Sequence, residues 1–219
     1  MNIVVIGPGK DPERFGTHFV NHCESEGHHV TKFSYRLFRE TPEKITERFA
    51  EEISELENID ILLYNCIGGF YPSQESNFIS GSVVNFDGWK EGIMINAAMP
   101  HTFTSKALYK MNENSAIVYM TSSASYLVNR ENYLDLVGYF GTKGVMNQLM
   151  RAYSKYNNKN AIACCFAPHI PYENPESAKK VMDKITERIL NLTKEDNGKI
   201  LQCYPPDARI WYHEGGKHA

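Results

Sequence analysis

The chain has 219 residues, a formal net charge of −3, 42% hydrophobic residues and 22% charged residues. These values are typical of a globular protein and argue against a disordered chain. The length suits one compact domain, which we expect to span residues 1–219. The negative charge argues against a general nucleic-acid-binding protein. No apolar run approaches the roughly 18 residues that a membrane span requires, so we expect no membrane partner.

Short apolar runs alternate with longer helical patterns along the chain. Buried strands are predicted at 2–7, 28–34, 59–66, 115–122, 160–166 and 198–204. Helices are predicted at 17–26, after the N-cap signal Thr41–Pro42, at 86–110, at 139–156 and through the apolar stripe from Val181 to Leu192. Strands that are apolar throughout and alternate with helices predict a Rossmann-like, doubly wound α/β fold. Its parallel sheet would be covered on both faces, in three layers, with the ligand at the carboxyl ends of the strands.

The segment GPGKDPERFG after the first predicted strand has the character of a phosphate-binding turn. Glycines allow a tight turn and close approach to a ligand, and the basic side chains could add charged contacts. The candidate cofactor-binding residues here are Gly7, Gly9, Lys10, Arg14, Phe15 and Gly16. The alternative is a strand-to-helix turn that binds no ligand.

The second predicted strand is followed by Ser34 and Arg36, which are also candidate cofactor-binding residues. A carboxylate at this place usually accepts a hydrogen bond from the ribose 2′-hydroxyl of NAD. A cation instead suits a 2′-phosphate, which favours NADP over NAD. A solvated arginine without a ligand is the alternative.

The five cysteines are odd in number, and their spacing fits neither a disulfide framework nor a zinc site. We expect them to be reduced and mostly buried. The first residues contain too short an apolar stretch for a signal peptide, which also favours a cytoplasmic protein. His18 and His22 lie four residues apart beside Cys23, a spacing compatible with zinc. Without a further ligand nearby, we expect a surface helix face and no metal.

Four motifs follow one another along the chain: Asn65 after the third strand, INAAMP with Asn96, VYMTSSAS with Ser122, and YFGTK with Tyr139 and Lys143. This order closely resembles the short-chain dehydrogenase/reductase family over nearly the whole chain. The resemblance implies a catalytic tetrad of Asn96, Ser122, Tyr139 and Lys143, with Ser123 as a rival for the serine. It also implies cofactor contacts from Asn65, Lys143 and Pro168.

The chemistry of the family accounts for these residue types. A free tyrosine titrates near ~10, and a neighbouring ammonium lowers that value. Tyr139 would therefore act as acid/base, with Lys143 supporting it and holding the nicotinamide ribose. Ser122 would hydrogen-bond the substrate oxygen, and Asn96 would hold a water that links Lys143 to solvent. The alternatives are a polar helix kink for Asn96 and a capping hydroxyl for Ser122.

The sequence departs from the family pattern in four places. The glycine turn is stretched and contains Pro8 and Pro12, and the turn after the third strand reads Tyr64-Asn65-Cys66-Ile67. The catalytic serine lies 17 residues before the tyrosine, which is longer than usual. His169 follows Pro168 where glycine is usual, and the segment before the last helix is short. The short segment predicts an open site, or one completed by a second subunit.

The sequence therefore predicts an NADP(H)-dependent oxidoreductase that interconverts a small-molecule carbonyl and an alcohol. The family commonly forms homodimers or homotetramers through the helices predicted at 100–110 and 139–156, which the resemblance implies here too. The rival interpretation is a catalytically weak or inactive nucleotide-binding sensor, or an assembly subunit, on the same fold.

Overall fold

The computed structural model describes residues 1–37, 39–66, 79–80, 83–84, 86–122, 137–204 and 209–213. Its main sheet has the strand order β2-β1-β3-β6-β7-β8-β9. The strands of this sheet are β1 Asn2–Ile6, β2 His29–Phe33, β3 Ile59–Tyr64, β6 Met111–Met120, β7 Ile162–Pro168, β8 Ile200–Tyr204 and β9 Arg209–His213. All pairings are parallel except that of β9 with β8. A separate small hairpin pairs β4 Ile79–Ser80 with β5 Val83–Val84.

Helices separate most of the strands of the main sheet along the chain. The α-helices are α1 Phe15–Ser25, α2 Pro42–Ser54, α3 Phe86–Ile93, α4 Met99–Ala107, α5 Val137–Tyr156 and α6 Pro175–Leu190. A π-helical turn, Met94–Ala98, joins α3 to α4, and 3₁₀ turns lie at Leu108–Lys110 and Lys194–Asp196. The predicted Rossmann-like, doubly wound α/β fold is therefore confirmed.

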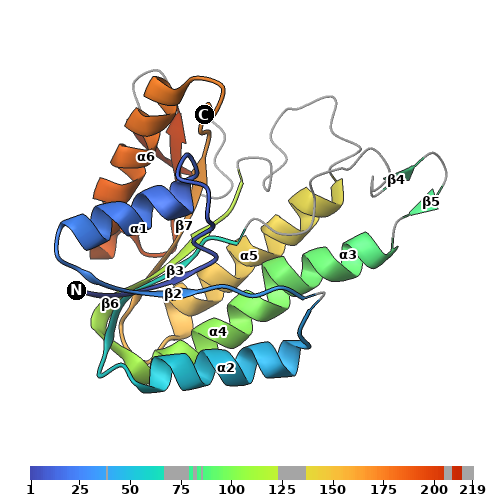
Figure 1. Cartoon of the computed structure of the whole chain (residues 1–219), viewed down its shortest axis with the longest axis horizontal. Helices are drawn as coiled ribbons and strands as arrows, with labels where there is room; N and C mark the ends of the chain where they lie inside the picture. The colour runs from blue at the N-terminus through green and yellow to red at the C-terminus, as the bar shows by residue number, and fades with distance from the viewer. Residues whose placement is uncertain are drawn as a thin grey trace.

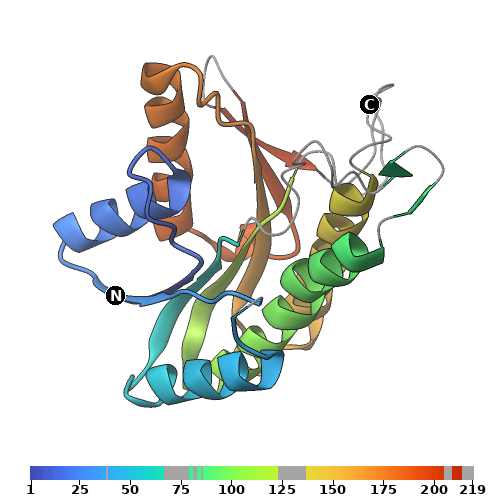
Figure 2. The ribbon, with the colours of Figure 1, turned by 45° about the vertical axis from the view of Figure 1, so that its right-hand side comes forward.

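The sheet is covered on both faces, as Figures 1 and 2 show. Helices α1 and α6 pack on one face through residues such as Phe19 and Ile185. Helices α2, α4 and α5 pack on the other through residues such as Phe49 and Phe103. Two covered faces explain why the strands are apolar throughout rather than alternating. All five cysteines are free and four of them are buried, as predicted, and the neighbours Cys164 and Cys165 face opposite layers.

Two helices begin as their sequences indicate. Thr41 caps α2, and its side chain accepts a hydrogen bond from the Lys44 N–H at 3.4 Å, with Pro42 in the first turn. Asn174 caps α6 in the same way, accepting from the Ser177 N–H at 3.1 Å. A cap oxygen satisfies one of the free N–H groups at a helix start, and proline there loses no hydrogen bond.

Two strands of the main sheet differ clearly from the prediction, and the small β4–β5 hairpin was not predicted. Strand β6 begins at Met111, four residues earlier than predicted, and its register with β3 is irregular before Ala116. Asn114 has a φ of 60° within this stretch, where the strand is bulged and most residues are polar, so no apolar run marks the strand start. Strand β9 was not predicted, because a short run at the sheet edge gives a weak signal.

The order of the strands positions the site. From β1 the chain passes to β2 on one side and then to β3 on the other, so β1 and β3 diverge at a topological switch point. Ligands of doubly wound folds bind outside the carboxyl ends of strands at such a point. The classic dinucleotide-binding order has a further strand outside the second. In the part of the chain that the structure describes, β2 is instead the edge of the sheet.

Candidate active site

Glycine is required at two positions of the turn that follows β1. Gly7 and Gly9 have φ values of +75° and +81°, a region that favours glycine. A Cβ atom at Gly7 would lie 2.6 Å from the Cys66 Sγ atom. The Gly7 N–H still donates to the Phe33 carbonyl at 2.8 Å, so the turn remains attached to the sheet. The backbone of this turn therefore packs directly on the residues that follow β3.

The start of α1 lies at the switch point and packs closely on the same turn. A Cβ atom at Gly16 would overlap the Pro8 carbonyl oxygen and the Asn65 Nδ2 atom. Arg14, the N-cap residue, makes no side-chain hydrogen bond to the helix start. Phe15 packs in the core, with its ring centroid 5.9 Å from that of Phe19. Phe15 can therefore offer a ligand only its backbone N–H.

The two basic side chains of the turn are at the surface. Lys10 is exposed. The Arg14 Nε atom lies 3.4 Å from the Asp11 carboxylate, and its guanidinium lies 4.2 Å from the centre of the Tyr172 ring. A bound anion would have to compete with Asp11 for Arg14. Lys10 is thus the more available cation of the two.

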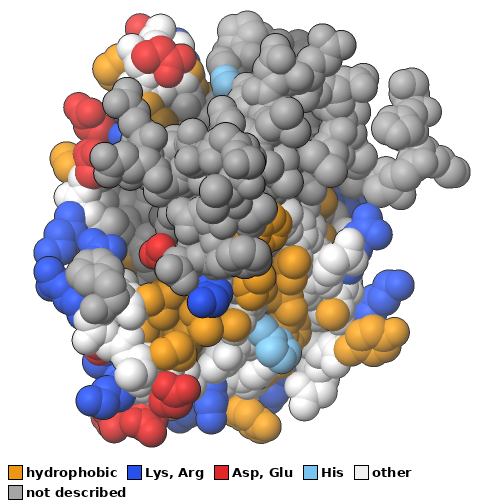
Figure 3. Space-filling view, turned by 90° about the vertical axis from the view of Figure 1, so that its right-hand side faces the viewer, with side chains coloured by type: hydrophobic (Ala, Val, Ile, Leu, Met, Phe, Trp, Pro, Cys, Tyr) orange, Lys and Arg blue, Asp and Glu red, His pale blue; other side chains and the backbone are white. Residues whose placement is uncertain are grey.

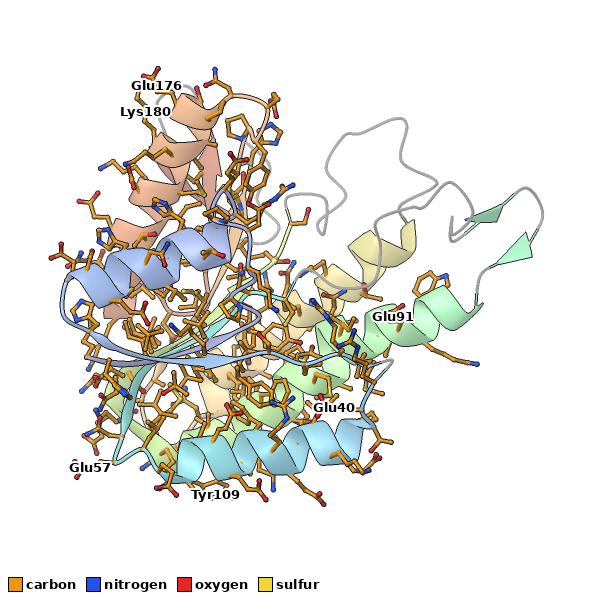
Figure 4. All side chains as sticks on the ribbon, in the orientation of Figure 1. Glu40, Glu57, Glu91, Tyr109, Glu176 and Lys180 are labelled. Atoms are coloured by element: carbon orange, nitrogen blue, oxygen red, sulfur yellow. The ribbon has the colours of Figure 1, made fainter. Side chains whose placement is uncertain are left out.

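The loop after β2 carries the two residues predicted to select the cofactor. Ser34 and Arg36 are both exposed. Arg48 of α2 holds the two ends of this loop together, since it donates to the Ser34 carbonyl and to the Glu40 carboxylate, both at 3.0 Å. Figure 4 labels Glu40 just before α2. The guanidinium also lies 4.4 Å from the centre of the Phe33 ring.

Asn65 joins the turn after β3 to the glycine turn. Its Nδ2 atom donates to the Gly7 carbonyl at 2.9 Å, and its backbone N–H donates to the Ile6 carbonyl at 2.8 Å. The residue is buried, so this contact is shielded from water. Asn65 therefore lies within the predicted cofactor site, where it supports the backbone of the turn.

Lys143 is the most deeply buried cation of the site. It lies on α5 and is 0% exposed. Its Nζ atom donates to the Met120 carbonyl at 2.9 Å and to the Cys66 carbonyl at 3.1 Å. Burial lowers the pKa of Lys143 to about 8, because water no longer stabilises the ammonium. Lys143 thus lies at the carboxyl ends of β3 and β6, still protonated at neutral pH.

Ser122 and Tyr139 complete the predicted catalytic set only in part. Ser122 is half-buried, two residues beyond the end of β6. Tyr139 lies on α5, one helical turn before Lys143, but its side chain lies outside the described residues, as do the rival Ser123 and residues 124–136. The distance between the phenol and the ammonium therefore stays a prediction.

Asn96 is buried within the π turn and faces α5. The residue is 0% exposed, and its Nδ2 atom donates to the Thr142 hydroxyl at 3.1 Å. Its Oδ1 atom accepts no hydrogen bond from any residue that the structure describes. Buried amide oxygens are nearly always satisfied, so this atom is an acceptor that a water or a ligand could use. The π turn brings Asn96 beside Thr142, the neighbour of Lys143 in sequence.

Pro168 lies at the end of β7, near the same edge of the sheet. The next residue, His169, donates its backbone N–H to the Cys203 carbonyl at 3.0 Å. Only residues 169–174 separate β7 from α6, so the segment is even shorter than predicted.

The residues considered as zinc ligands have another role. His18 contacts Asp183 of α6, with 2.9 Å between Nε2 and Oδ1. Within the described ranges, no cluster of three metal-binding side chains occurs. Among the same residues, no helix combines the length and apolar character needed to cross a bilayer.

Sequence reasoning missed several residues that lie around Asn96. Tyr64 donates to the Ile95 carbonyl at 2.7 Å and lies 2.5 Å from the Tyr35 hydroxyl, and Thr142 receives the amide of Asn96. One signal was available, since Pro100 lies four residues after Asn96 and removes a helical N–H. The tyrosines gave none, because an aromatic residue at a strand end usually belongs to the core.

No family model matches the sequence, and no curated protein matches it. Solved structures do. A short-chain dehydrogenase/reductase from Serratia marcescens BCRC 10948 has a TM-score of 0.70 at 15% identity, covering 92% of this chain and 94% of that one. A Burkholderia multivorans protein described as a short-chain dehydrogenase/reductase, solved with NADP bound, has a TM-score of 0.68 at 14% identity, covering 92% and 95%. The chain therefore has the fold of the short-chain dehydrogenase/reductases.

Proposed function

We propose that this protein is an NADP(H)-preferring oxidoreductase that uses short-chain dehydrogenase/reductase chemistry to interconvert a carbonyl and an alcohol. The observation that carries the proposal is the position of Lys143. Its ammonium is buried at the carboxyl ends of β3 and β6 and is held by two backbone carbonyls. Burying an ammonium is costly, and such a charge at the ligand-binding edge of the sheet is typical of a functional site.

The residues of the glycine turn fit a dinucleotide. Positive φ values at Gly7 and Gly9 let the backbone turn tightly at the ligand-binding edge, and α1 begins behind them without a side-chain cap. The unpaired N–H groups of a helix start favour a phosphate. Gly7, Gly9 and the start of α1 would therefore hold the pyrophosphate, with Lys10 as the added cation. Bound NADPH would supply the hydride for reduction.

The remaining steps belong to the protein. Ser122 would donate a hydrogen bond to the substrate oxygen and hold it beside Tyr139. Tyr139 would give its phenolic proton to that oxygen as the alcohol forms. The Lys143 ammonium would lower the pKa of the phenol and so stabilise the phenolate that remains.

Asn96 would complete the path of the proton to solvent. Its buried Oδ1 atom has no donor among the described residues, which supports a bound water at this place. A water held there could return a proton from solvent toward Lys143. The Thr142 hydroxyl, hydrogen-bonded to Asn96, would fix the orientation of the amide.

Arg36 supports the preference for NADP. It is exposed on the loop after β2. Burial raises the pKa of the Cys66 thiol, and the charge of Arg36 offsets a part of that rise. A cation near the adenine ribose suits a 2′-phosphate, with which arginine forms strong paired contacts. The Burkholderia multivorans structure contains NADP, which agrees with this choice.

The short 169–174 segment favours an open substrate site, which suits a large carbonyl compound or weak catalysis. Self-association would help to cover such a site. Large apolar side chains are exposed on the helices next to it, with Ile93 of α3 48% exposed and Val145 of α5 43% exposed. Figure 3 shows apolar side chains gathered on this side of the molecule. We propose a homodimer or homotetramer formed through the helical segments 100–110 and 139–156.

The proposal is tested by measuring NADPH oxidation over a panel of aromatic aldehydes, diketones and keto esters. Tyr139→Phe should lower turnover about 100-fold or more, with the Kd for NADPH within about twofold of the parent. Full activity in Tyr139→Phe would disprove the mechanism. NADPH binding without turnover of any carbonyl would favour the rival, a nucleotide-binding sensor.

A further inference from the structure

The hydroxyl of Tyr64 contacts two parts of the candidate site, the loop after β2 and the π turn. Tyr64 is the last residue of β3 and is 1% exposed. Its hydroxyl donates to the Ile95 carbonyl at 2.7 Å and lies 2.5 Å from the Tyr35 hydroxyl. A phenol has one proton, so Tyr35 must donate to Tyr64. Burial raises the pKa of both phenols, so both keep their protons near neutral pH.

The Ile95 carbonyl is open to Tyr64 because of the π turn and Pro100. In an α-helix the Met99 N–H would donate to Ile95. Here it donates to Met94 instead, the spacing of a π turn. The residue one step further along is Pro100, which has no N–H to offer. The Ile95 carbonyl therefore takes its hydrogen bond from a side chain of the sheet.

The same π turn determines where Asn96 points. Each residue of an α-helix turns by about 100°, so losing the extra residue of a π turn would rotate Asn96 away from α5. In the π turn, the Asn96 amide donates to the Thr142 hydroxyl at 3.1 Å, and Thr142 precedes Lys143 in the chain. A fixed π turn is thus a condition for the Asn96–Thr142 contact.

We propose that Tyr64 is a positioning residue that holds the π turn, and through it Asn96, in the geometry needed for proton transfer. Pro100 leaves the Ile95 carbonyl open, and the Tyr64 hydroxyl occupies it. This inference rests on the proposed function for its catalytic consequence. The Tyr64 phenol is buried, and its effect on the reaction passes through Ile95 and Asn96.

The neighbouring strand offers a matched control. Tyr119 of β6 is the register partner of Tyr64 and is 0% exposed. Its hydroxyl lies 2.6 Å from the Thr104 hydroxyl on α4, beyond the π turn. Tyr64→Phe and Tyr119→Phe each delete one buried hydroxyl from the same layer. Each deletion removes buried hydrogen bonding, and urea unfolding of both variants measures the general stability loss that comes with it.

The first readout is the Asn96 side-chain amide signal in ¹H–¹⁵N spectra of the ligand-free protein, assigned with Asn96→Asp. The signal should shift in Tyr64→Phe and stay in place in Tyr119→Phe. The second readout is turnover with a carbonyl compound that the parent reduces. Tyr64→Phe should lower kcat about 10- to 100-fold with KM and the NADPH Kd within about twofold, while Tyr119→Phe keeps kcat. An unmoved Asn96 signal, or equal kcat losses in both variants, would overturn the inference.

The two readouts separate this inference from the proposed function. If the parent neither binds NADPH nor reduces a carbonyl, the proposed function fails, while the Asn96 signal still decides whether Tyr64 holds the π turn. Should Tyr64→Phe not fold, the unmodified protein takes its place. A Tyr64 hydroxyl proton held by the Ile95 carbonyl should exchange slowly with water and give an NMR cross-peak to the backbone protons of Ile95 and Asn96. A Tyr64 hydroxyl that exchanges rapidly and gives no such cross-peak would overturn the inference as well.

Discussion

The loop after β2 and the π turn before α4 both carry residues of the candidate site, but they hold them differently. Ser34 and Arg36 are exposed, and the loop is held mainly through Arg48 at its ends. Asn96 is fully buried, and both its backbone neighbour and its amide are hydrogen-bonded to other elements. Exposed side chains can adapt to a ligand, whereas buried ones must be in place beforehand. We therefore expect the loop after β2 to control which cofactor binds. The buried π turn with Asn96 should control the rate of turnover.

The largest effect should follow from removing the buried ammonium. Lys143→Met should lower kcat about 100-fold or more, because the Tyr139 phenol loses the charge that lowers its pKa. Steady-state kinetics measures this, with Lys155→Met, an exposed change on the same helix, as the control. Comparable loss in both variants would mean that Lys143 has no special role.

Lys143 should also make the free energy of unfolding depend on pH. Its pKa is about 8 in the folded chain against 10.5 in an unfolded one, so the unfolded state binds more protons between these values. Stability therefore rises with pH in this window, by about 3 kcal/mol relative to Lys143→Met. Urea unfolding of both proteins from pH 8 to pH 10.5 measures the difference. A constant difference would contradict the burial of a charged Lys143.

The glycine turn should respond to a single methyl group. Gly16→Ala should weaken NADPH binding about tenfold, because its Cβ overlaps the Pro8 carbonyl and Asn65. Gly27→Ala is the control, since a Cβ there meets nothing within 4 Å and only the φ of +79° is unfavourable. Fluorescence titration should show normal NADPH binding in Gly27→Ala. Equal binding by both variants would exclude the turn from the cofactor site.

The exposed loop should change selectivity more than rate. Arg36→Ala should weaken NADPH binding about tenfold and leave NADH binding unchanged, because only NADPH carries the 2′-phosphate. Lys32→Ala, a nearby change at a surface pair with Glu24, is the control. An equal loss of affinity for NADPH and for NADH in Arg36→Ala would remove the basis for an NADP preference.

The sequence was most informative where local rules act. Thr41 and Pro42 predicted the start of α2, and the apolar runs predicted the strands, because caps and buried strands leave short-range patterns. Asn96 could be selected only through the resemblance, whereas Lys143 also drew attention by its spacing of four residues from Tyr139, and both lie at the candidate site. Neither the full burial of Lys143 nor its two carbonyl partners could be predicted, since both depend on residues far away in the chain.

The π turn shows the same limit more sharply. Pro100 marks a break in helical hydrogen bonding that sequence can reveal, but the donor that repairs it, Tyr64, lies 31 residues before Ile95. The bulge of β6 near Asn114 likewise depends on the register with β3. Such features arise when separate elements meet, and one sequence without its fold does not contain a local signal for them.

The most direct test of the account is a fluorescence titration of the unmodified protein with NADPH and with NADH. The account predicts saturable binding of NADPH, at least about tenfold tighter than that of NADH, because Arg36 and the turn of Gly7 and Gly9 are assigned to NADP. Failure of both cofactors to bind would contradict the account, because the role proposed for Lys143 requires a bound dinucleotide.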